Sequence, residues 1–330
     1  MLEPAVLKTP PATYFQQILR RFGGTAAMRA AILEGTGVSE EEIDRAPVEI
    51  TPAQQFRQFD NMNLLFGEGW PLTAPELWRP SAHGALGVAV TSAPDVGAAM
   101  YILAKYITAH APNQRLKLIR ARGTVTLRHD FPVVVSESLE KVMAEALLLG
   151  VSSTLALLLG HAHQDVRFDY LWPEPPYGGK LEAALGGQVR WGAAANAVVV
   201  PTRLLAMRSP LANAALNQHA VELLEQAAAA NAGPDGLKAR VQRLLATSDH
   251  GRLPSSFVAR SLGLSQRTFA RRLANAGASY RDLIDAELKA RASRWLEAGM
   301  FSKAEIGERL GFADATGFSR ACRRWFRGSD

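Results

Sequence analysis

Cysteine is almost absent from this sequence. Cys322 is the single cysteine among 330 residues, so an intramolecular disulfide and a metal cluster held by cysteines are both excluded. The stretch MLEPAVLKTPPATYF at the start lacks the basic segment and apolar run that mark a secretory signal. These absences predict a protein of a reducing compartment, and we expect it in the cytoplasm.

An uninterrupted apolar run long enough to cross a membrane is also missing. The nearest candidate is AEALLLGVSSTLALLLG, residues 144–160, which approaches the ~18 residues that such a span needs. Glu145 and the polar stretch 152–154 interrupt it. We therefore interpret it as a buried helix, or as two helices that meet near Gly150, and we expect no membrane partner.

Catalytic and cofactor motifs are missing as well. The sequence has no G-x-S-x-G, and Gly178-Gly179-Lys180 lacks the spacing of a phosphate-binding loop. His161 and His163 suit a shared metal only on a strand or loop, and no third ligand lies nearby in the sequence; solvated or helix-end histidines are the favoured interpretation. The sequence thus predicts no catalytic residues, no metal site and no cofactor, and we expect no enzyme.

Positive charge, by contrast, is concentrated in the C-terminal part of the chain. Residues 238–330 hold 18 Lys+Arg and 9 Asp+Glu, a net charge of +9, whereas residues 1–237 carry a net charge of −3. Such asymmetry indicates a polyanion as the partner of the C-terminal part, the alternative being a solvated surface that happens to be basic. Because 330 residues exceed one typical hydrophobic core, we also expect two domains or more.

The segment SSFVARSLGLSQRTFARRL, residues 255–273, has the pattern of a helix, a tight turn and a second helix. Ser265 is a good N-cap for the second helix. Phe269 and Leu273 lie four apart and share its inner face, while Arg267 and Arg271 point outward. This is the helix-turn-helix pattern, in which the second helix enters the DNA major groove.

A second copy of the pattern lies in SKAEIGERLGFADATGFSRACRRWF, residues 302–326. Ser302 and Glu305 predict a capping box, and Asp314 is a candidate cap for the next helix. Phe318 and Cys322 repeat the inner pair of the first copy. Between the copies, residues 279–299 predict a helix about 30 Å long, close to the ~34 Å of one DNA turn.

The two stretches LGLSQRTFARRL and LGFADATGFSRACRRWF resemble the DNA-binding domain of AraC-type transcription regulators over roughly 236–330. The family continues with a proline and a short helix, so the end at Asp330 is expected to be truncated or frayed. Because Ala270 and Ala315 offer only methyl contacts, we expect the second recognition helix to read bases weakly. The resemblance and the pattern together predict DNA contacts by Ser265, Gln266, Arg267, Ala270, Arg271, Ala315, Thr316, Arg320 and Arg323.

The first two thirds of the chain predict a mostly helical α+β domain. Helices are expected over 14–34, 52–66 and 94–110, and period-two alternation predicts a β-hairpin over 115–130. Three arginines along that hairpin are candidates for binding an acidic effector, although outward-facing strand arginines are equally ordinary: Arg120, Arg122 and Arg128. The loop NAGPDG is the expected domain boundary.

Two stretches of this region, HGALGVAVTSAPDVGAAMYILAKY and LGGQVRWGAAANAVVVPTRLLAMRSPL, resemble the arabinose-binding-like N-terminal domain of the OruR-like branch of AraC regulators. The resemblance implies a domain that senses an effector or dimerises, and it does not name the effector. The expected fold is therefore mostly α, with an α+β sensing domain at 1–233 and an all-α domain of two helix-turn-helix units joined by a long helix at 234–330.

The predicted function is sequence-specific regulation of transcription. The expected partners are double-stranded DNA, a small-molecule effector, a second copy in a homodimer and, for an activator, RNA polymerase. Two alternatives stay open at this point: control by a protein partner without a small ligand, and an enzyme-like N-terminal domain fused to a DNA-binding domain. A polar catalytic cluster would favour the enzyme, and a closed pocket would favour the small ligand.

Overall fold

The chain divides into two compact units, Met1–Ala229 and Ala230–Asp330, each with its own hydrophobic core. We call them the N-terminal unit and the C-terminal unit. The computed structural model describes residues 10–44, 50, 52–111, 114–131, 135–232, 234–246, 251–262, 264–298, 301–312 and 314–326.

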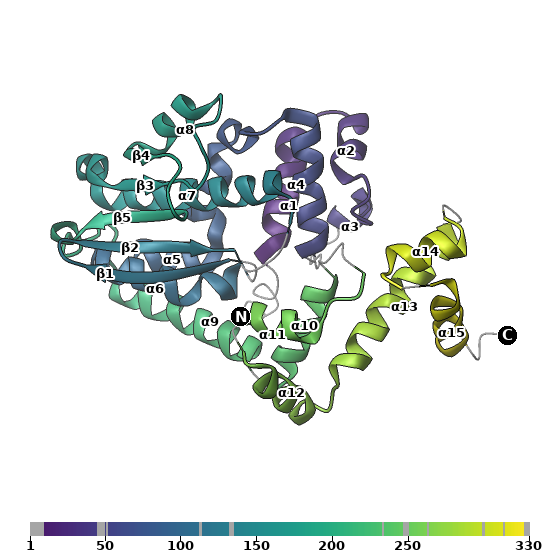
Figure 1. Cartoon of the computed structure of the whole chain (residues 1–330). Coiled ribbons are helices and arrows are strands. Elements are labelled where there is room, and N and C mark those ends of the chain that lie inside the picture. The colour runs from purple at the N-terminus through teal and green to yellow at the C-terminus, as the bar shows by residue number, and fades with distance from the viewer. Residues whose placement is uncertain are drawn as a thin grey trace. The chain divides into compact units, whose positions relative to one another are not determined.

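The N-terminal unit is mainly helical and contains one small sheet (Figure 1). Its helices are α1 (Pro10–Phe22), α2 (Ala26–Leu33), α3 (Glu40–Asp44), α4 (Pro52–Phe66), α5 (Gly84–Thr91), α6 (Val96–His110), α7 (Glu137–Leu159), α8 (Gly178–Leu185) and α9 (Ala214–Ala232). Short 3₁₀ turns are η2 (Trp70–Thr73), η3 (Pro75–Trp78), η4 (Pro80–His83), η5 (Gly160–Asp165) and η6 (Thr202–Leu204). The strands are β1 (Arg115–Ala121), β2 (Thr124–Asp130), β3 (Arg167–Asp169), β4 (Gln188–Arg190) and β5 (Ala197–Pro201).

The sheet has the strand order β1-β2-β5-β3-β4, in which only β3 and β4 run parallel (Figure 1). Strands β1 and β2 form the predicted hairpin, with Arg115 opposite Asp130 and Ala121 opposite Thr124. Gly123 closes the turn at φ +81°, a left-handed conformation that glycine adopts without strain. The hairpin brings one face of β2, which carries Val125 and Leu127, into the core.

Helix α7 is the central core helix and packs on α4, α5, α6, α8 and β5. It runs unbroken through Gly150, so the alternative of two helices meeting there is wrong. An interior glycine costs only about 1 kcal/mol, and buried apolar residues such as Leu148 and Leu155 continue on both sides of it. By length and mean hydropathy of 2.0 the segment Glu137–Asp165 matches a membrane span, but 83% of its most apolar window is buried inside the structure.

The first predicted helix, 14–34, is interrupted. Helix α1 ends at Phe22, and α2 begins at Ala26 after a Gly-Gly pair. The side chain of Thr25 caps α2 by accepting a hydrogen bond from the Met28 backbone N–H at 3.2 Å. The two glycines lower the helix propensity directly before Thr25, a good N-cap at which a second helix can begin. The spacing of apolar residues, on which the prediction of one helix depended, does not show this break.

The C-terminal unit is all helical. Its helices are α10 (Pro234–Ala246), α11 (Ser255–Ser261), α12 (Gln266–Asn275), α13 (Tyr280–Ala298), α14 (Lys303–Arg309) and α15 (Ala315–Trp325). They share one core, in which residues from α10, α12, α13 and α15 are buried. The two helix-turn-helix units are α11–α12 and α14–α15, and α13 joins them as the sequence predicted.

Candidate nucleic-acid interface and ligand cavity

Helix α12 presents an apolar face to the core and a basic face to solvent. Ser265 caps it, because its hydroxyl accepts a hydrogen bond from the Thr268 backbone N–H at 3.2 Å. Phe269 and Leu273 are each 1% exposed. Three of the predicted contact residues are exposed on the other side: Arg267, Ala270 and Arg271. Within the part of the chain that the structure describes, neither arginine has an acidic partner.

Gln266, at the first position of α12, is also exposed but has a local partner. Its Nε2 donates a hydrogen bond to Ser255 Oγ at 3.3 Å. This contact joins the N-terminal ends of α11 and α12 and orients the amide at the leading end of the helix. The residues predicted to lead α12 into a groove therefore all stand at one exposed end and face.

Helix α15 repeats this arrangement with one difference from the expected inner face. Asp314 caps it by accepting a hydrogen bond from the Gly317 backbone N–H at 2.6 Å. Phe318, Ala321 and Trp325 are buried, whereas Cys322 is only half-buried. The indole packs edge-on against Phe318, with ring centroids 6.5 Å apart. The large ring two turns after Phe318 thus takes the core position, and the prediction that Cys322 is the inner partner was incomplete.

The outer face of α15 carries Thr316, Arg320 and Arg323, all exposed. The side chain of Ala315 lies outside the described residues. Arg324 forms an ion pair within the unit, because its guanidinium contacts the Asp285 carboxylate of α13 at 2.7 Å. The outer face of this helix therefore offers fewer hydrogen-bond donors near its leading end than α12 does.

The two helix-turn-helix units are tied to each other and to α13. Asp285 contacts Arg324 of the second unit and Arg252, in the loop before α11, at 3.6 Å. That loop also runs against the turn of the second unit: a Cβ on Gly251 would lie 2.3 Å from the Leu310 carbonyl oxygen. Only glycine, which has no Cβ, allows the two backbones to come this close. Gly251 therefore sets how closely the two helix-turn-helix units pack. Sequence reasoning had not identified this glycine.

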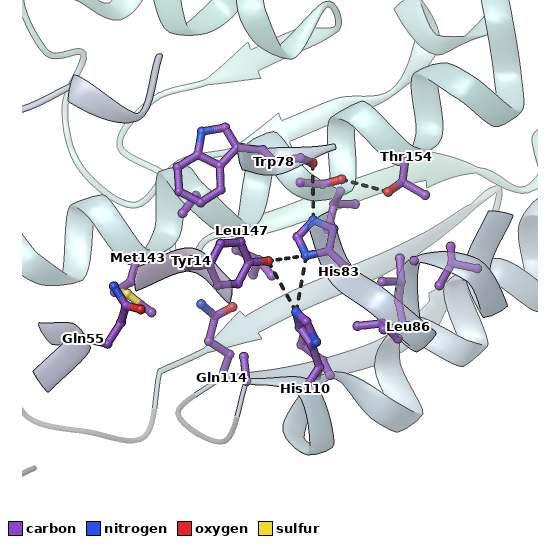
Figure 2. Close-up of a pocket in the computed structure, with 18 of the residues that line it drawn as sticks. Tyr14, Gln55, Trp78, His83, Leu86, His110, Gln114, Met143, Leu147 and Thr154 are labelled. Carbon is purple, nitrogen blue, oxygen red and sulfur yellow. Dashed lines mark hydrogen bonds between the residues drawn. The ribbon is translucent and has the colours of Figure 1, made fainter. Parts of the chain in front are cut away.

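The N-terminal unit contains a partly open cavity of about 110 Å³ between α1, α4, η4, α6 and α7. Most of its wall is apolar and includes Phe56, Phe59, Leu103, Ile107, Met143 and Leu147. Tyr14, His83 and His110 line it as well and point toward one another (Figure 2). Among the described residues that line the cavity, none is Asp, Glu, Lys or Arg.

The three polar rings form one hydrogen-bonded cluster. Tyr14 Oη contacts His83 Nδ1 and lies 3.4 Å from His110 Nε2, and the two imidazoles are 3.3 Å apart between the same nitrogens. His83 Nε2 faces the Trp78 carbonyl oxygen at 3.4 Å. With the His83 proton on Nε2, the set is satisfied when His110 Nε2–H donates to the tyrosine oxygen and the tyrosine hydroxyl donates to His83 Nδ1.

All three rings are uncharged at neutral pH. Burial lowers the pKa of His83, and burial together with the neighbouring His83 ring lowers the pKa of His110 to about 3. Burial also raises the pKa of the Tyr14 hydroxyl. The three rings therefore form a neutral hydrogen-bonding surface in a desolvated setting, where an imidazolium ion would lack a counter-charge.

Two glutamines add unsatisfied polar atoms to the same cavity. Gln55 and Gln114 both line it, and each residue is only 6% exposed. Their Oε1 atoms have no hydrogen-bond partner among the residues that the structure describes. A buried acceptor without a donor costs roughly 1–3 kcal/mol, so these atoms mark places where a donor from a bound molecule would be stabilising.

Sequence reasoning did not identify this cluster. Tyr14 lies 69 residues before His83, and His83 lies 27 residues before His110, so no spacing motif joins them. The three arginines that were predicted as effector contacts lie on the β1–β2 hairpin and do not line this cavity. They are also not brought together by the fold.

Arg128 and Arg120 lie on opposite faces of the hairpin, because Arg128 pairs with Lys117 and Arg120 with Val125, and side chains alternate along a strand. Arg128 is engaged by Asp130 at 3.0 Å. Arg122 is exposed in the turn. Arg120 lines a separate surface groove, which also includes Tyr101, Leu118 and Leu205.

The histidine pair of the HAH sequence separates in the structure. His161 is exposed, as expected of a solvated side chain, and His163 lies in the last turn of η5, as expected of a helix-end histidine, although its side chain is buried. His163 Nε2 lies 3.3 Å from Ser152 Oγ, but that hydroxyl donates its proton to the Leu185 carbonyl oxygen at 2.7 Å. The serine is therefore not prepared as a nucleophile, since its hydrogen bond is directed away from the imidazole.

Two family models match the chain. Residues 27–209 match the arabinose-binding domain of AraC transcription regulator, N-term, and residues 258–329 match a helix-turn-helix domain. The Ornithine utilization regulator of Pseudomonas aeruginosa is 27% identical over 319 residues, 96% of this chain and 93% of that protein. The HTH-type transcriptional regulator VirS of Mycobacterium tuberculosis is 25% identical over 248 residues, 74% of this chain and 72% of that protein. The crystal structure of the transcriptional regulator CdpR from Pseudomonas aeruginosa matches 82% of this chain and 88% of that chain, with a TM-score of 0.44 and 24% identity.

The chain has an α+β unit followed in sequence by two helix-turn-helix units. This arrangement is typical of one class of protein, the DNA-binding transcription regulators. The first family model covers more than half of the sequence, and the chain belongs to the AraC-type transcription regulators. The matching families and curated relatives are regulators and not enzymes. The prediction of a DNA-binding regulator with an α+β N-terminal domain is thereby confirmed, and the enzyme alternative is set aside.

Proposed function

We propose that residues 234–330 recognise DNA through α12 and α15, and that residues 1–233 control this binding in response to a small molecule held in the Tyr14 cavity. The observation that carries the DNA contact is that Arg267 and Arg271 of α12 are both exposed and have no acidic partner among the described residues. The proposed contact residues are Ser265, Gln266, Arg267, Ala270, Arg271, Ala315, Thr316, Arg320 and Arg323.

The first recognition helix should dominate specificity. Arg267 and Arg271 each carry a planar guanidinium group that bonds guanine O6 and N7 together or grips a phosphate. The corresponding face of α15 offers Thr316 and Arg320. Helix α13 has 19 residues, which correspond to about 28 Å, and one DNA turn is about 34 Å. One chain would then place the two helices in successive major-groove segments on the same face of the duplex.

A small effector is favoured over control by a protein partner alone, because the N-terminal unit contains a cavity with unsatisfied polar atoms. The name of one relative refers to ornithine. A cation of that kind needs acidic partners, and the described lining has none. Arg120 stays a candidate for an acidic effector in its separate groove, and Arg122 and Arg128 for contacts on the hairpin.

The remaining proposals concern assembly and location. As a regulator of this family, the protein is expected to work in the cytoplasm, to form a homodimer and, as an activator, to contact RNA polymerase. A homodimer would double the number of DNA half-sites and require two copies of the site at a fixed spacing.

The test is selection of a DNA site from random sequences with the full chain, followed by binding measurements on that site. Arg267→Ala should weaken binding to the selected site. Arg79→Ala, which removes an exposed arginine of the N-terminal unit, is the matched control and should leave binding unchanged. Equal losses for both variants, or a failure to enrich any sequence, would contradict the proposal.

A further inference from the structure

We propose that Asp285 is a positioning residue for DNA recognition. It holds the two helix-turn-helix units at the angle and spacing that let α12 and α15 occupy two successive major-groove segments of one site. The inference rests on the proposed function, because it requires that both helices contact DNA. Asp285 acts through two arginines that it binds, Arg252 in the loop before α11 and Arg324 of α15.

Helix α13 by itself does not set how the two units face each other. It ends at Ala298, and α14 begins at Lys303, so the covalent link from α13 to the second unit is one short stretch of backbone. Each residue of such a link has two soft backbone dihedrals. The rotation of the second unit about the end of α13 must therefore be fixed by non-covalent contacts.

Three segments of the C-terminal unit meet at Asp285: the loop before α11, helix α13 and helix α15. One carboxylate oxygen, Oδ2, contacts Arg324 Nη2 at 2.7 Å, and the other, Oδ1, lies 3.6 Å from Arg252 Nη2. The Asp285 side chain is only 19% exposed. Because it is largely shielded from water, its attraction for the two guanidinium groups is screened less than that of a fully exposed ion pair.

Arg252 also touches the second unit directly. A Cβ on Gly311 would lie 2.9 Å from the Arg252 backbone nitrogen, and the Arg252 guanidinium stands 6.0 Å from the centre of the Phe312 ring. The next residue of the loop, Leu253, accepts a hydrogen bond from Tyr280 Oη at 2.7 Å. The loop is thus tied to the start of α13 and lies against the turn of the second unit, with the Asp285 carboxylate between them.

Asp285 keeps two positive charges together. Among the described residues it is the one acidic partner of both Arg252 and Arg324. Without the carboxylate, the two guanidinium groups would repel each other and push the loop and α15 apart. Partly exposed ion pairs contribute little to folding stability. Asp285→Asn should therefore change how the two units are held more than whether they fold.

The spacing of the two DNA segments reports how rigidly the units are held. One extra base pair moves the second segment by ~3.4 Å along the duplex and turns it by about 35° around the axis. Rigidly held units then lose groove contacts of one recognition helix, and the affinity should fall about ten-fold or more. Units that turn independently follow the displaced segment and lose little.

The experiment compares two DNA duplexes with the full chain. The first carries the site selected from random sequences, in which replacement of base pairs in blocks locates the two segments. The second has one base pair inserted between them. Fluorescence anisotropy gives both Kd values, and their ratio should be about ten or more for the unmodified chain. Asp285→Asn should weaken binding to the selected site and lower the ratio to about three or less.

The matched control is Glu287→Gln. Glu287 pairs with Arg291 of the same helix at 2.8 Å, and its side chain is 20% exposed. The control removes the same charge from the same helix without breaking a link between the units, so the ratio should stay at the value of the unmodified chain. Partial unfolding would lower the active fraction on both duplexes equally, and the ratio would not change.

If Asp285→Asn does not fold by circular dichroism, Arg324→Gln decides, because it breaks one contact of the link at a side chain that is 54% exposed. It should lower the ratio in the same direction. An unchanged ratio in the variant that is measured, or an equal fall in Glu287→Gln, overturns the role of Asp285 alone. An unmodified chain that selects no site, or that binds both spacings equally, overturns the proposed two-segment binding and the role of Asp285 with it.

Discussion

Replacing Arg271 and Leu273 one at a time separates DNA contact from folding within a single helix. The two residues are two positions apart on α12, one exposed and one 1% exposed. Arg271→Ala removes a side chain that has no acidic partner among the described residues, so the free energy of unfolding should change by less than about 0.5 kcal/mol. Its DNA affinity should fall by roughly 1–3 kcal/mol, about 5- to 150-fold in Kd.

Leu273→Ala should have the opposite profile. The side chain is buried with Phe269, Val258 and Leu237 in the core of the C-terminal unit. Removing a buried leucine and leaving a cavity costs about 3–5 kcal/mol, a large part of the ~5–15 kcal/mol that stabilises a domain. Well below its lowered unfolding midpoint, the folded fraction should bind DNA with the affinity of the unmodified chain.

The assay pairs chemical denaturation with fluorescence-anisotropy titration of the selected DNA site, on the full chain and both variants. The decisive quantity is the difference between the two variants in each measurement. An Arg271→Ala variant whose Kd stays within about two-fold of the unmodified chain would show that the outer face of α12 is wrongly assigned. A Leu273→Ala variant of unchanged stability would refute the assignment of the inner face.

Three further predictions follow from other features. Gly251→Ala should weaken DNA binding by altering how the helix-turn-helix units pack, because its Cβ would lie 2.3 Å from the Leu310 carbonyl oxygen. The control is Gly179→Ala, whose Cβ would have no atom within 4 Å and which should leave DNA binding unchanged. Footprinting of both variants would compare their DNA binding. Burial raises the pKa of Glu145 to about 7, so the native state holds a proton that the unfolded state has lost, and stability should fall as pH rises from about 4.5 to 7, by roughly 3 kcal/mol. Glu145→Gln should remove that decline in denaturation curves recorded between those pH values, and an identical decline in the variant would refute the assignment. A fragment of residues 234–330 should bind DNA by itself, with affinity that falls steeply as salt rises, because arginines that neutralise phosphates release counterions; no binding at low salt in a gel-shift assay would contradict this.

Much of the C-terminal unit could be predicted from the sequence because its signals are local. Ser265, Ser302 and Asp314 cap helices through hydrogen bonds to the third residue after them, within reach of a few residues of sequence. The inner pair of α12 is set by the i, i+4 period, and the basic charge of 238–330 is visible by counting. Caps, period and charge all act within one or two helical turns, so the chain determines them before it folds.

Tertiary packing decided the rest. The Tyr14 cluster unites α1, η4 and α6, and the close approach of Gly251 to Leu310 joins segments 59 positions apart, without any spacing that sequence could reveal. The same holds for α7, where burial on both sides of Gly150 outweighs the cost of a glycine in a helix. A cavity, a close backbone contact and the choice between neighbouring residues for the core all depend on which surfaces meet, and periodicity within one segment carries no information about its partner in space.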